Sequence, residues 1–380
     1  MLAIRPLDSL ADVDAAQWDA LVGQDDPFVE HAFLSALEAS GSVGGDTGWL
    51  PRHLTVWDGD RLIGALPLYE KDHSYGEYIF DWAWADAANR IGIPYYPKLV
   101  SMVPVTPATG TRLLVHPASE RGEVIQGLID GAFQVAEELR ASSVHWLFVS
   151  EGEAKELGRD ARLMRRTTQQ FHWHNDAYKD FDDYLARFRS SARKQVRKER
   201  RRARESGLEL RVIEGCDMTD REWSVLPSLY RDTCGRKGSY PYLTPLFFRE
   251  IRRRCPELVV CAMAFDGERP VAASLNFEKG AHLYGRYWGC SADYDALHFE
   301  LCYYQLIDRA IQRKMARFEA GAQGMHKLKR GLMPSPVHSM HWIRHPVLAD
   351  AVGEYLPREA TQVRRQIGYL EEHGPFKRDC

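Results

Sequence analysis

Apolar and polar residues follow the same pattern in two stretches of this chain that lie 208 residues apart. HLTVWDGDRLIGALPL covers residues 53–68, and CAMAFDGERPVAASLN covers residues 261–276. Each stretch predicts a strand, a tight turn with an acidic residue followed by glycine, and a second strand of small and apolar residues. This pattern is typical of a β-hairpin, because glycine tolerates the backbone angles of a two-residue turn.

The segments around the two hairpins repeat in the same order. A helix led by aromatic residues precedes each hairpin, HAFLSALEAS in the first half and PLFFREIRRR in the second. A strand-like segment, an amphipathic helix and a buried strand follow each hairpin. In the first half these are TRLLVHP, GEVIQGLIDGAFQVAEELR and SVHWLFVS, and in the second half HLYGRYWG, HFELCYYQLIDRAIQRK and ARFEAG.

This order predicts an α/β (α+β) fold made by tandem duplication, in which each half is a mixed, mostly antiparallel sheet flanked by helices. It is also the order of the GNAT acyltransferase fold, whose central strands splay to admit an acyl donor. A chance α/β resemblance is the alternative. We therefore predict two GNAT-like domains in one chain.

The length of 380 residues and the hydrophobic content of 44% also favour two domains, because one core rarely organises so long a chain. We predict an N-terminal domain over 1–175, a C-terminal domain over 176–345, and a C-terminal helix and tail over 346–380. The join falls near QQFHWHNDAYKDFDDYLARF, where His172 and His174 share one strand face. No acid or cysteine at matching spacing completes a ligand set, so no metal site is predicted.

Seven cysteines lie in the second half without a CxxC pair. We therefore expect neither a disulfide framework nor a zinc ribbon. The first residues, MLAIRPLDSLADVDAAQWDALV, are acidic and have no signal-peptide pattern. Nowhere do eighteen apolar residues run together. We expect a cytoplasmic protein without a membrane span.

Positive charge is concentrated in one predicted helix, residues 187–206, which begins the C-terminal domain. Although the formal net charge of the chain is −3, residues 187–204 hold ten cations and one acid, Glu199. Val196 and Ala203 are too few for a core-facing stripe, so a partner with many phosphates would suit this helix. The alternative is a solvated helix paired with acids elsewhere in the protein. The candidate phosphate contacts are Arg193, Lys194, Arg197, Lys198 and Arg201.

Longer stretches resemble the bacterial FemAB-like family of peptidoglycan biosynthesis or recognition proteins, within the GNAT superfamily. They are DPFVEHAFLSALEASGSVG, GWLPRHL, PLYEKDHSYGEY, YYPKL, PVTPATGTRLL, QFHWHN, YWGCSADYDALHFELCYYQLIDRAI and EAGAQGMHKLKRG, and the resemblance spans roughly residues 8–376. Related Fem transferases have tandem GNAT-like domains and move an amino acid from aminoacyl-tRNA to an amine of a peptidoglycan precursor. Where many members of the family carry an acid, this chain has Met325.

The resemblance implies an N-acyl- or aminoacyltransferase, with aminoacyl-tRNA as donor and a muropeptide or small-molecule amine as acceptor. An acyl-CoA-dependent enzyme is the first alternative, but GCSADYDALHFELC and GTRLLVHPASERGE lack the R/Q-x-x-G-x-G/A loop that cradles a pyrophosphate. A non-catalytic protein that binds cell-wall precursors or nucleic acid is the second. No cofactor is predicted.

The segment EAGAQGMHKLKRG, residues 319–331, is the first candidate site. Gly321, Gly324 and Gly331 permit positive φ and close approach of a ligand. The side chains that can meet a carboxylate or phosphate are His326, Lys327, Lys329 and Arg330, and Gln323 is a further candidate contact. Because the loop follows the predicted central strand, we expect it to close over the acceptor. A flexible surface turn is the alternative.

Amide formation requires a neutral amine and stabilisation of the tetrahedral oxyanion. Glu319 at the end of the strand, or His298 at the start of the preceding helix pattern, could accept the amine proton. Tyr304 or a backbone amide could polarise the carbonyl, although Tyr304 could equally be a core residue. These three side chains are the catalytic candidates.

Aromatic residues crowd the segment SYGEYIFDWAWADAANRIGIPYYPKL, residues 74–99. Amphipathic rings in a stretch broken by glycine and proline indicate a recognition surface for sugar, peptide or nucleobase, and a core role for half of them is the alternative. The candidate substrate contacts here are Tyr75, Asp81, Tyr96 and Lys98. Arg286 and Trp288, in YGRYWG, could line the second domain's side of the same groove.

Overall fold

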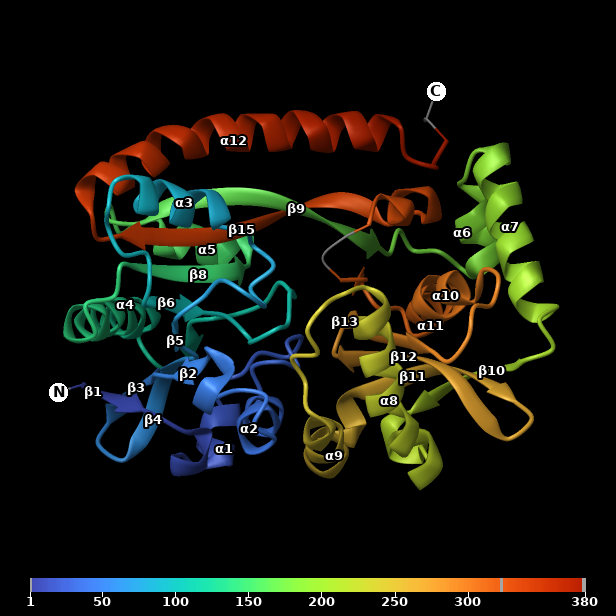
Figure 1. Cartoon of the computed structure of the whole chain (residues 1–380), viewed down its shortest axis with the longest axis horizontal. Helices are drawn as coiled ribbons and strands as arrows, with labels where there is room; N and C mark the ends of the chain where they lie inside the picture. Colours follow the sequence, from blue (N-terminus) through green and yellow to red (C-terminus); the bar gives the residue numbers. More distant parts are fainter. Residues whose placement is uncertain (1, 322–323, 378–380) are drawn as a thin grey trace. The chain divides into compact units, whose positions relative to one another are not determined.

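The computed structural model describes residues 2–321 and 324–377, and its chain divides into two compact units. Unit 1 consists of Met1–Gln169 and Pro336–Arg365, and unit 2 consists of Gln170–Ser335 and Gln366–Cys380. Sheets flanked by helices make up each unit (Figure 1). The predicted α/β class is therefore confirmed.

The chain returns to unit 1 late in the sequence. Strand β15 (Met333–Ile343) pairs antiparallel with strand β8 (Ser143–Val149), and Met340 of β15 lies in the apolar core of unit 1. The contiguous domains 1–175 and 176–345 stay a prediction, and the compact units differ from them in giving residues 336–365 to unit 1. Strand pairing between distant segments causes the difference.

Unit 1 contains two sheets. One has the strand order β1-β3-β4-β7, and the other includes, in order, β15-β8-β6-β5-β2. The remaining strands are β1 (Ala3–Leu7), β2 (Leu50–Pro51), β3 (His53–Asp58), β4 (Arg61–Leu66), β5 (Tyr69–Lys71), β6 (Lys98–Ser101) and β7 (Leu114–Val115). The helices are α1 (Ala15–Asp19), α2 (His31–Ala39), α3 (Trp82–Arg90), α4 (Arg121–Glu138), α5 (Glu151–Leu157) and α12 (Pro346–Glu372), which ends in unit 2.

Helix α4 shows how the apolar pattern builds the core of unit 1. Val124, Leu128 and Ala132 recur at helical spacing and are buried, so they share one face of the helix. This face packs in the same apolar cluster as Leu54 and Val56 of β3. The predicted amphipathic helix is thereby confirmed.

Unit 2 has one sheet with the strand order β10-β11-β12-β13-β14-β9. Its strands are β9 (Met164–His174, which begins in unit 1), β10 (Glu209–Glu214), β11 (Val259–Asp266), β12 (Arg269–Lys279), β13 (His282–Cys290) and β14 (Arg317–Glu319). Its helices are α6 (Phe181–Ala186), α7 (Ser190–Arg204), α8 (Asp220–Arg236), α9 (Pro245–Arg254), α10 (Leu297–Phe299) and α11 (Gln305–Gln312).

The two predicted hairpins are present, and they share a detail that the sequence did not predict. Gly59 and Gly267 occupy the turns with φ of 59° and 58°. Each hairpin also has an irregularity in its register, between Val56 and Trp57 in one and between Ala264 and Phe265 in the other. These positions are 208 residues apart, like the sequence repeat, so the two hairpins correspond down to their bulges.

The predicted helix of residues 298–314 is not uniform. It begins with α10, passes through a π-helical turn at Glu300–Tyr304 and ends with α11. Such turns insert an extra residue into a helix and are frequent at functional sites. Nowhere in residues 2–321 and 324–377 is a helix both long and apolar enough to cross a membrane.

Close packing of α8 on β13 gives a test of this fold. A Cβ atom at Gly289 would lie 2.3 Å from the carbonyl oxygen of Leu229, so the helix backbone must move to accept it. We expect Gly289→Ala to lower the free energy of unfolding by about 1–3 kcal/mol, measured by urea unfolding. Gly235→Ala, where a Cβ meets nothing within 4 Å, is the matched control and should leave stability unchanged or slightly higher. Equal stabilities would contradict the packing.

Candidate functional site

Three glycines of segment 319–331 have the backbone conformation that the sequence predicts. Gly321, Gly324 and Gly331 have φ of 81°, 120° and 82°, which favour glycine. The last two flank a 3-10 helix, Met325–Arg330, so the basic side chains between them lie on a defined turn. Gln323 lies outside the described residues.

Lys327 is buried inside this loop, with 2% of its surface exposed. Its Nζ donates a hydrogen bond of 2.7 Å to the carbonyl oxygen of Gly321. Burial disfavours the ammonium and the nearby Arg286 guanidinium repels it, and together they lower the pKa of Lys327 to about 7. An approaching anion would offset both effects, so the site suits an anionic group.

Glu319 ends β14 and is also 2% exposed. Its Oε1 lies 3.1 Å from Nη2 of Arg317, and its Oε2 lies 3.8 Å from Nε2 of His172, which stands opposite it in the β14–β9 register. Burial lowers the pKa of His172 well below its usual range, so this imidazole is neutral at neutral pH. Arg317 therefore supplies the counter-charge of the Glu319 carboxylate.

Three candidates form an aromatic cluster. The ring centroid of His298 lies 5.2 Å from that of Trp288 and 6.0 Å from that of His326. Nε2 of His326 lies 2.9 Å from the hydroxyl of Tyr303. Burial lowers the pKa of His298 to about 3, and a base this weak is poorly matched to proton transfer at neutral pH.

Tyr304 lies instead beside a cavity of about 430 Å³ between α7 and the 3-10 helix. Arg330 donates to both carboxylate oxygens of Glu199, from Nη2 at 2.8 Å and from Nε at 3.1 Å. The Tyr304 hydroxyl donates to the same carboxylate. Burial and the charge of Glu199 raise the pKa of Tyr304 above its usual range. This side chain therefore stays protonated and is bound to the basic helix.

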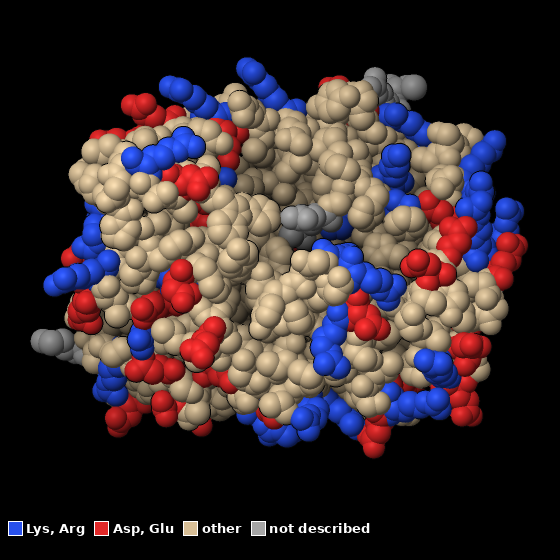
Figure 2. Space-filling view, viewed as in Figure 1, with Lys and Arg blue, Asp and Glu red and all other residues tan. Residues whose placement is uncertain are grey.

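Helix α7 exposes most of its cations, and Figure 2 shows Lys and Arg side chains along the edge where it lies. Of the five predicted phosphate contacts, Lys194, Arg197, Lys198 and Arg201 are exposed and Arg193 is half-buried. Two of them have acidic partners, because Arg197 lies 3.3 Å from Asp182 and Arg201 lies 3.7 Å from Glu205. The paired arginines fit the solvated alternative, and the outward array fits a polyanionic partner.

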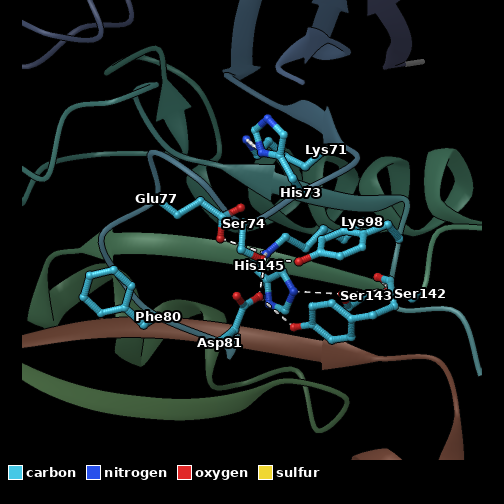
Figure 3. A network of polar contacts seen from close by, with 12 residues as sticks. Lys71, His73, Ser74, Glu77, Phe80, Asp81, Lys98, Ser142, Ser143 and His145 are labelled. Carbon is cyan, nitrogen blue, oxygen red and sulfur yellow. Dashed lines mark hydrogen bonds and ion pairs between the residues drawn. The ribbon is translucent and has the colours of Figure 1, made fainter. Parts of the chain in front are cut away.

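Three candidates from the aromatic segment meet in a buried network of unit 1 (Figure 3). Nζ of Lys98 donates to Oγ of Ser74 and to Oε2 of Glu77, each at 2.8 Å, and to the Asp81 carboxylate. The Tyr96 hydroxyl lies 2.9 Å from the same Ser74 oxygen. The structure thus brings Asp81, Tyr96 and Lys98 together around one ammonium.

The two acids of this network differ in their proton affinity. Burial raises the pKa of Glu77 to about 7 despite the nearby Lys98. Burial acts the same way on Asp81, but Lys98 more than offsets it and the pKa falls to about 2. Within the described residues, Oε1 of Glu77 and Oδ1 of Asp81 are buried without a hydrogen-bond partner. The network therefore retains capacity to accept hydrogen bonds.

The backbone of Tyr75 contacts a second lysine of unit 1, Lys71. The ring of Tyr75 is at the surface, 57% exposed, with its centroid 5.2 Å from that of Trp82. Its carbonyl oxygen accepts a 3.1 Å hydrogen bond from Lys71, whose Nζ lies 3.6 Å from the centroid of the Trp49 ring. Burial lowers the pKa of Lys71 to about 7. Lys71 is the last residue of β5, so its hydrogen bond to Tyr75 links the aromatic segment to that strand.

Two buried histidines complete the polar interior of unit 1. Nδ1 of His145 lies 2.7 Å from Nδ1 of His341, and the Nε2 atoms contact Ser143 and Ser339. One ring must donate from Nδ1 and the other must accept, so the contact requires the accepting ring to be neutral. Burial lowers the pKa of His145 to about 3 and that of His341 well below its usual range.

Sequence patterns missed several members of these clusters. Glu199 is the one acid among the cations of residues 187–204, and this isolation is the signal in the sequence for its inward role. Lys71 and Glu77 carry no such signal, because their burial depends on contacts with distant segments, such as that of Glu77 with Lys98. Within the described residues, no group of three or more His, Cys, Asp or Glu side chains could hold a metal ion.

A protein-family model matches the sequence of nearly the whole chain. The model of the FemAB-like proteins, described as peptidoglycan biosynthesis/recognition, matches residues 9–378. The chain belongs to the FemAB-like family. No protein with a curated description matches the sequence of this FemAB-like protein.

Solved structures resemble this FemAB-like chain in fold. The crystal structure of FemX is 12% identical with a TM-score of 0.54, and the match covers 90% of this chain and 98% of that chain. The C-terminal domain of a putative lysylphosphatidylglycerol synthetase from Agrobacterium fabrum is 9% identical with a TM-score of 0.55, covering 92% and 97%. L-PGS from Bacillus licheniformis is 12% identical with a TM-score of 0.52, covering 88% and 98%.

At these identities the likeness establishes the fold, which confirms the prediction of tandem GNAT-like units. The family match indicates an acyltransferase enzyme. The residues of the site are not tested by these similarities, so their roles stay predictions.

The neutral histidine pair predicts acid sensitivity. The pKa values of His145 and His341 are lower in the folded protein than in the unfolded chain, which therefore binds more protons as pH falls below about 6.5. The stabilisation is complete above that pH and is lost progressively toward pH 3. Between pH 8 and pH 5 we expect a loss of roughly 2–4 kcal/mol in the free energy of unfolding, measured with urea.

His341→Gln removes one titrating ring and should make this loss smaller. Exposed His373 provides the matched control, because His373→Gln removes a histidine that is not buried. If both variants lose as much stability as the unchanged protein between pH 8 and pH 5, the neutral pair is not the cause.

Proposed function

We propose that this FemAB-like protein is an aminoacyltransferase that moves an aminoacyl group from aminoacyl-tRNA to an amine of a peptidoglycan precursor or small metabolite. The family gives the general class, peptidoglycan biosynthesis/recognition within an acyltransferase fold. The observation that carries the choice of donor is the outward cationic face of α7. No cofactor enters this proposal.

The inward side of α7 supports this role, because it leaves the outer cations available. Glu199 is bound by Arg330, and Nη2 of Arg200 lies 3.2 Å from the buried Glu300. These contacts attach the helix to the body of unit 2 through neighbouring residues. Outward lysines such as Lys194 and Lys198 then track phosphates, with an affinity that falls as salt rises.

The transfer itself is assigned to the loop of residues 319–331. The acceptor amine attacks the carbonyl carbon of the aminoacyl ester, so that a C–N bond forms and the ester C–O bond to the ribose breaks. Glu319 receives the amine proton, directly or through water, and returns it to the departing ribose oxygen. Lys327 holds an anionic group of the acceptor. The bound anion favours the ammonium form of Lys327, which burial disfavours.

The aromatic surface and buried network of unit 1 are assigned to acceptor recognition. Tyr75 and Trp82 present ring faces of the kind that pack against sugar and peptide groups. In the same segment, Oε1 of Glu77 and Oδ1 of Asp81, which have no hydrogen-bond partner within the described residues, can accept hydrogen bonds from hydroxyl or ammonium groups. A muropeptide offers both kinds of group.

The donor is tested by incubating the protein with charged total tRNA and, in parallel, with acetyl-CoA, against a panel of amines and muropeptides. We expect amide products with charged tRNA only, identified by mass spectrometry. Phosphatidylglycerol vesicles belong in the acceptor panel, because one similar structure is named as a putative lysylphosphatidylglycerol synthetase. Products from acetyl-CoA alone would replace the proposed donor with an acyl-CoA.

The control for the donor assignment is a variant of α7 in which Arg193, Lys194, Arg197 and Lys198 are changed to alanine. This variant should bind tRNA more weakly and with a flatter dependence on salt, because fewer counterions are released. Arg249→Ala, on the exposed side of α9, is the matched single-cation control. An unchanged salt slope in the α7 variant would contradict tRNA binding by this helix.

The two loop residues should differ in their kinetic effects. Lys327→Ala removes a charged hydrogen bond to the acceptor, worth about 1.5–3 kcal/mol, and should mainly raise KM for the acceptor by roughly tenfold to a hundredfold. Glu319→Gln removes the proton acceptor and should mainly lower kcat by roughly 10²-fold to 10⁴-fold. Steady-state kinetics with varied acceptor concentration measures both.

Glu278→Gln is the matched control for Glu319→Gln, because Glu278 is also paired with an arginine, Arg309 at 2.9 Å, in a strand of unit 2. It should leave kcat nearly unchanged. Full kcat in Glu319→Gln would move the base elsewhere, with His298 as the next candidate, or show that the amine arrives neutral.

A further inference from the structure

The cavity beside α7 is lined in part by apolar side chains to which the proposed transfer reaction assigns no role. Its walls are apolar, formed by Val196 of α7, Phe299 of α10 and Met325 of the 3-10 helix. Met325 is 53% exposed although it is a large apolar residue. About 430 Å³ of space lies between these side chains, a volume in the range of small-molecule sites.

Arg330 and Phe299 form a flat surface in this cavity, and the charge of Arg330 is balanced by Glu199. The guanidinium carbon of Arg330 lies 3.3 Å from the centroid of the Phe299 ring. All three nitrogens of Arg330 donate, two to Glu199 and Nη1 to the carbonyl oxygen of His326 at 2.7 Å. Because its charge is already paired with Glu199, Arg330 offers a planar surface for stacking rather than a free charge for an anion.

The rim of the cavity carries the positive charge of Lys329. His326 and Lys329 line it and are exposed. On α7, Lys198 follows the rim residue Gln195 by three positions and therefore lies on the same side of the helix. A ligand that suits the whole cavity has a flat aromatic body for the floor and a phosphate for the rim.

We propose that this cavity binds a nucleotide, with its base stacked on the Arg330–Phe299 pair and its phosphate held by Lys329 and Lys198. The inference rests on the proposed function and deepens it, because it names where a nucleotide of a substrate lies. That nucleotide belongs either to the unpaired end of the RNA donor or to a nucleotide-linked precursor. Bases stack on aromatic and guanidinium planes with little dependence on sequence.

Calorimetry with adenosine 5′-monophosphate, uridine 5′-monophosphate and inorganic phosphate tests the site on the full chain. Both nucleotides should bind more tightly than phosphate by roughly fivefold to a hundredfold, the contribution of one stacked base. Lys329→Ala should weaken all three probes, and Phe299→Leu should weaken the nucleotides only. Arg249→Ala is the control and should change none of them.

Two further probes distinguish the sources of the nucleotide, the RNA trinucleotide CCA and UDP-N-acetylglucosamine. Tighter binding of CCA than of either mononucleotide, lost in Lys329→Ala, supports the RNA end. The same result for UDP-N-acetylglucosamine supports a nucleotide-linked precursor. Because Lys329 is exposed, Lys329→Ala should fold normally, and circular dichroism checks this even if Phe299→Leu is unstable.

Phosphate that binds as tightly as the nucleotides, or nucleotide binding that is unchanged in Lys329→Ala, overturns the inference. Full aminoacyl transfer from tRNA by the Lys329→Ala and Phe299→Leu variants also overturns it while leaving the proposed function intact. Nucleotide binding at the cavity by a protein that transfers nothing supports the inference and contradicts the proposed function.

Discussion

The carboxylate of Glu199 connects the basic helix to the glycine-rich loop, and much of unit 2 depends on that connection. Glu199 accepts hydrogen bonds from Gln195 on its own helix, from Arg330 on the loop and from Tyr304 on the π-helical turn. An ion pair in a buried position is costly to break, because the remaining charge cannot find water. Three segments far apart in the sequence therefore share one constraint.

This constraint explains how a helix so rich in cations folds against the protein. Like charges along α7 repel one another, and the helix has few apolar residues to bury. The inward pairs formed by Glu199 and Arg200 compensate for both deficits. The outer face is then exposed to solvent or to a polyanion. One side of the helix is therefore attached to unit 2, and the other side can bind an anionic partner.

Unit 1 also buries charged and polar side chains, and it pairs them with one another. Its interior holds Lys98 against two acids, and the rings of His145 and His341 against each other. The low dielectric of the interior makes a hydrogen bond or ion pair strong when both groups are paired, and it makes an unpaired polar group costly. Among the described residues, Oε1 of Glu77 and Oδ1 of Asp81 are buried without a hydrogen-bond partner, and a buried polar group in this state requires a specific explanation.

Local sequence determined the hairpins, the amphipathic helices and the positive φ of the glycines, because each depends on residues close together in the chain. It also determined the family, and the isolation of Glu199 among cations. Only the tertiary structure decided that β15 returns to pair with β8, that Tyr304 binds Glu199, and that Lys98 meets Glu77 and Asp81. Those contacts join segments separated by up to some two hundred residues, and no local pattern encodes which partner a strand or a buried charge will find.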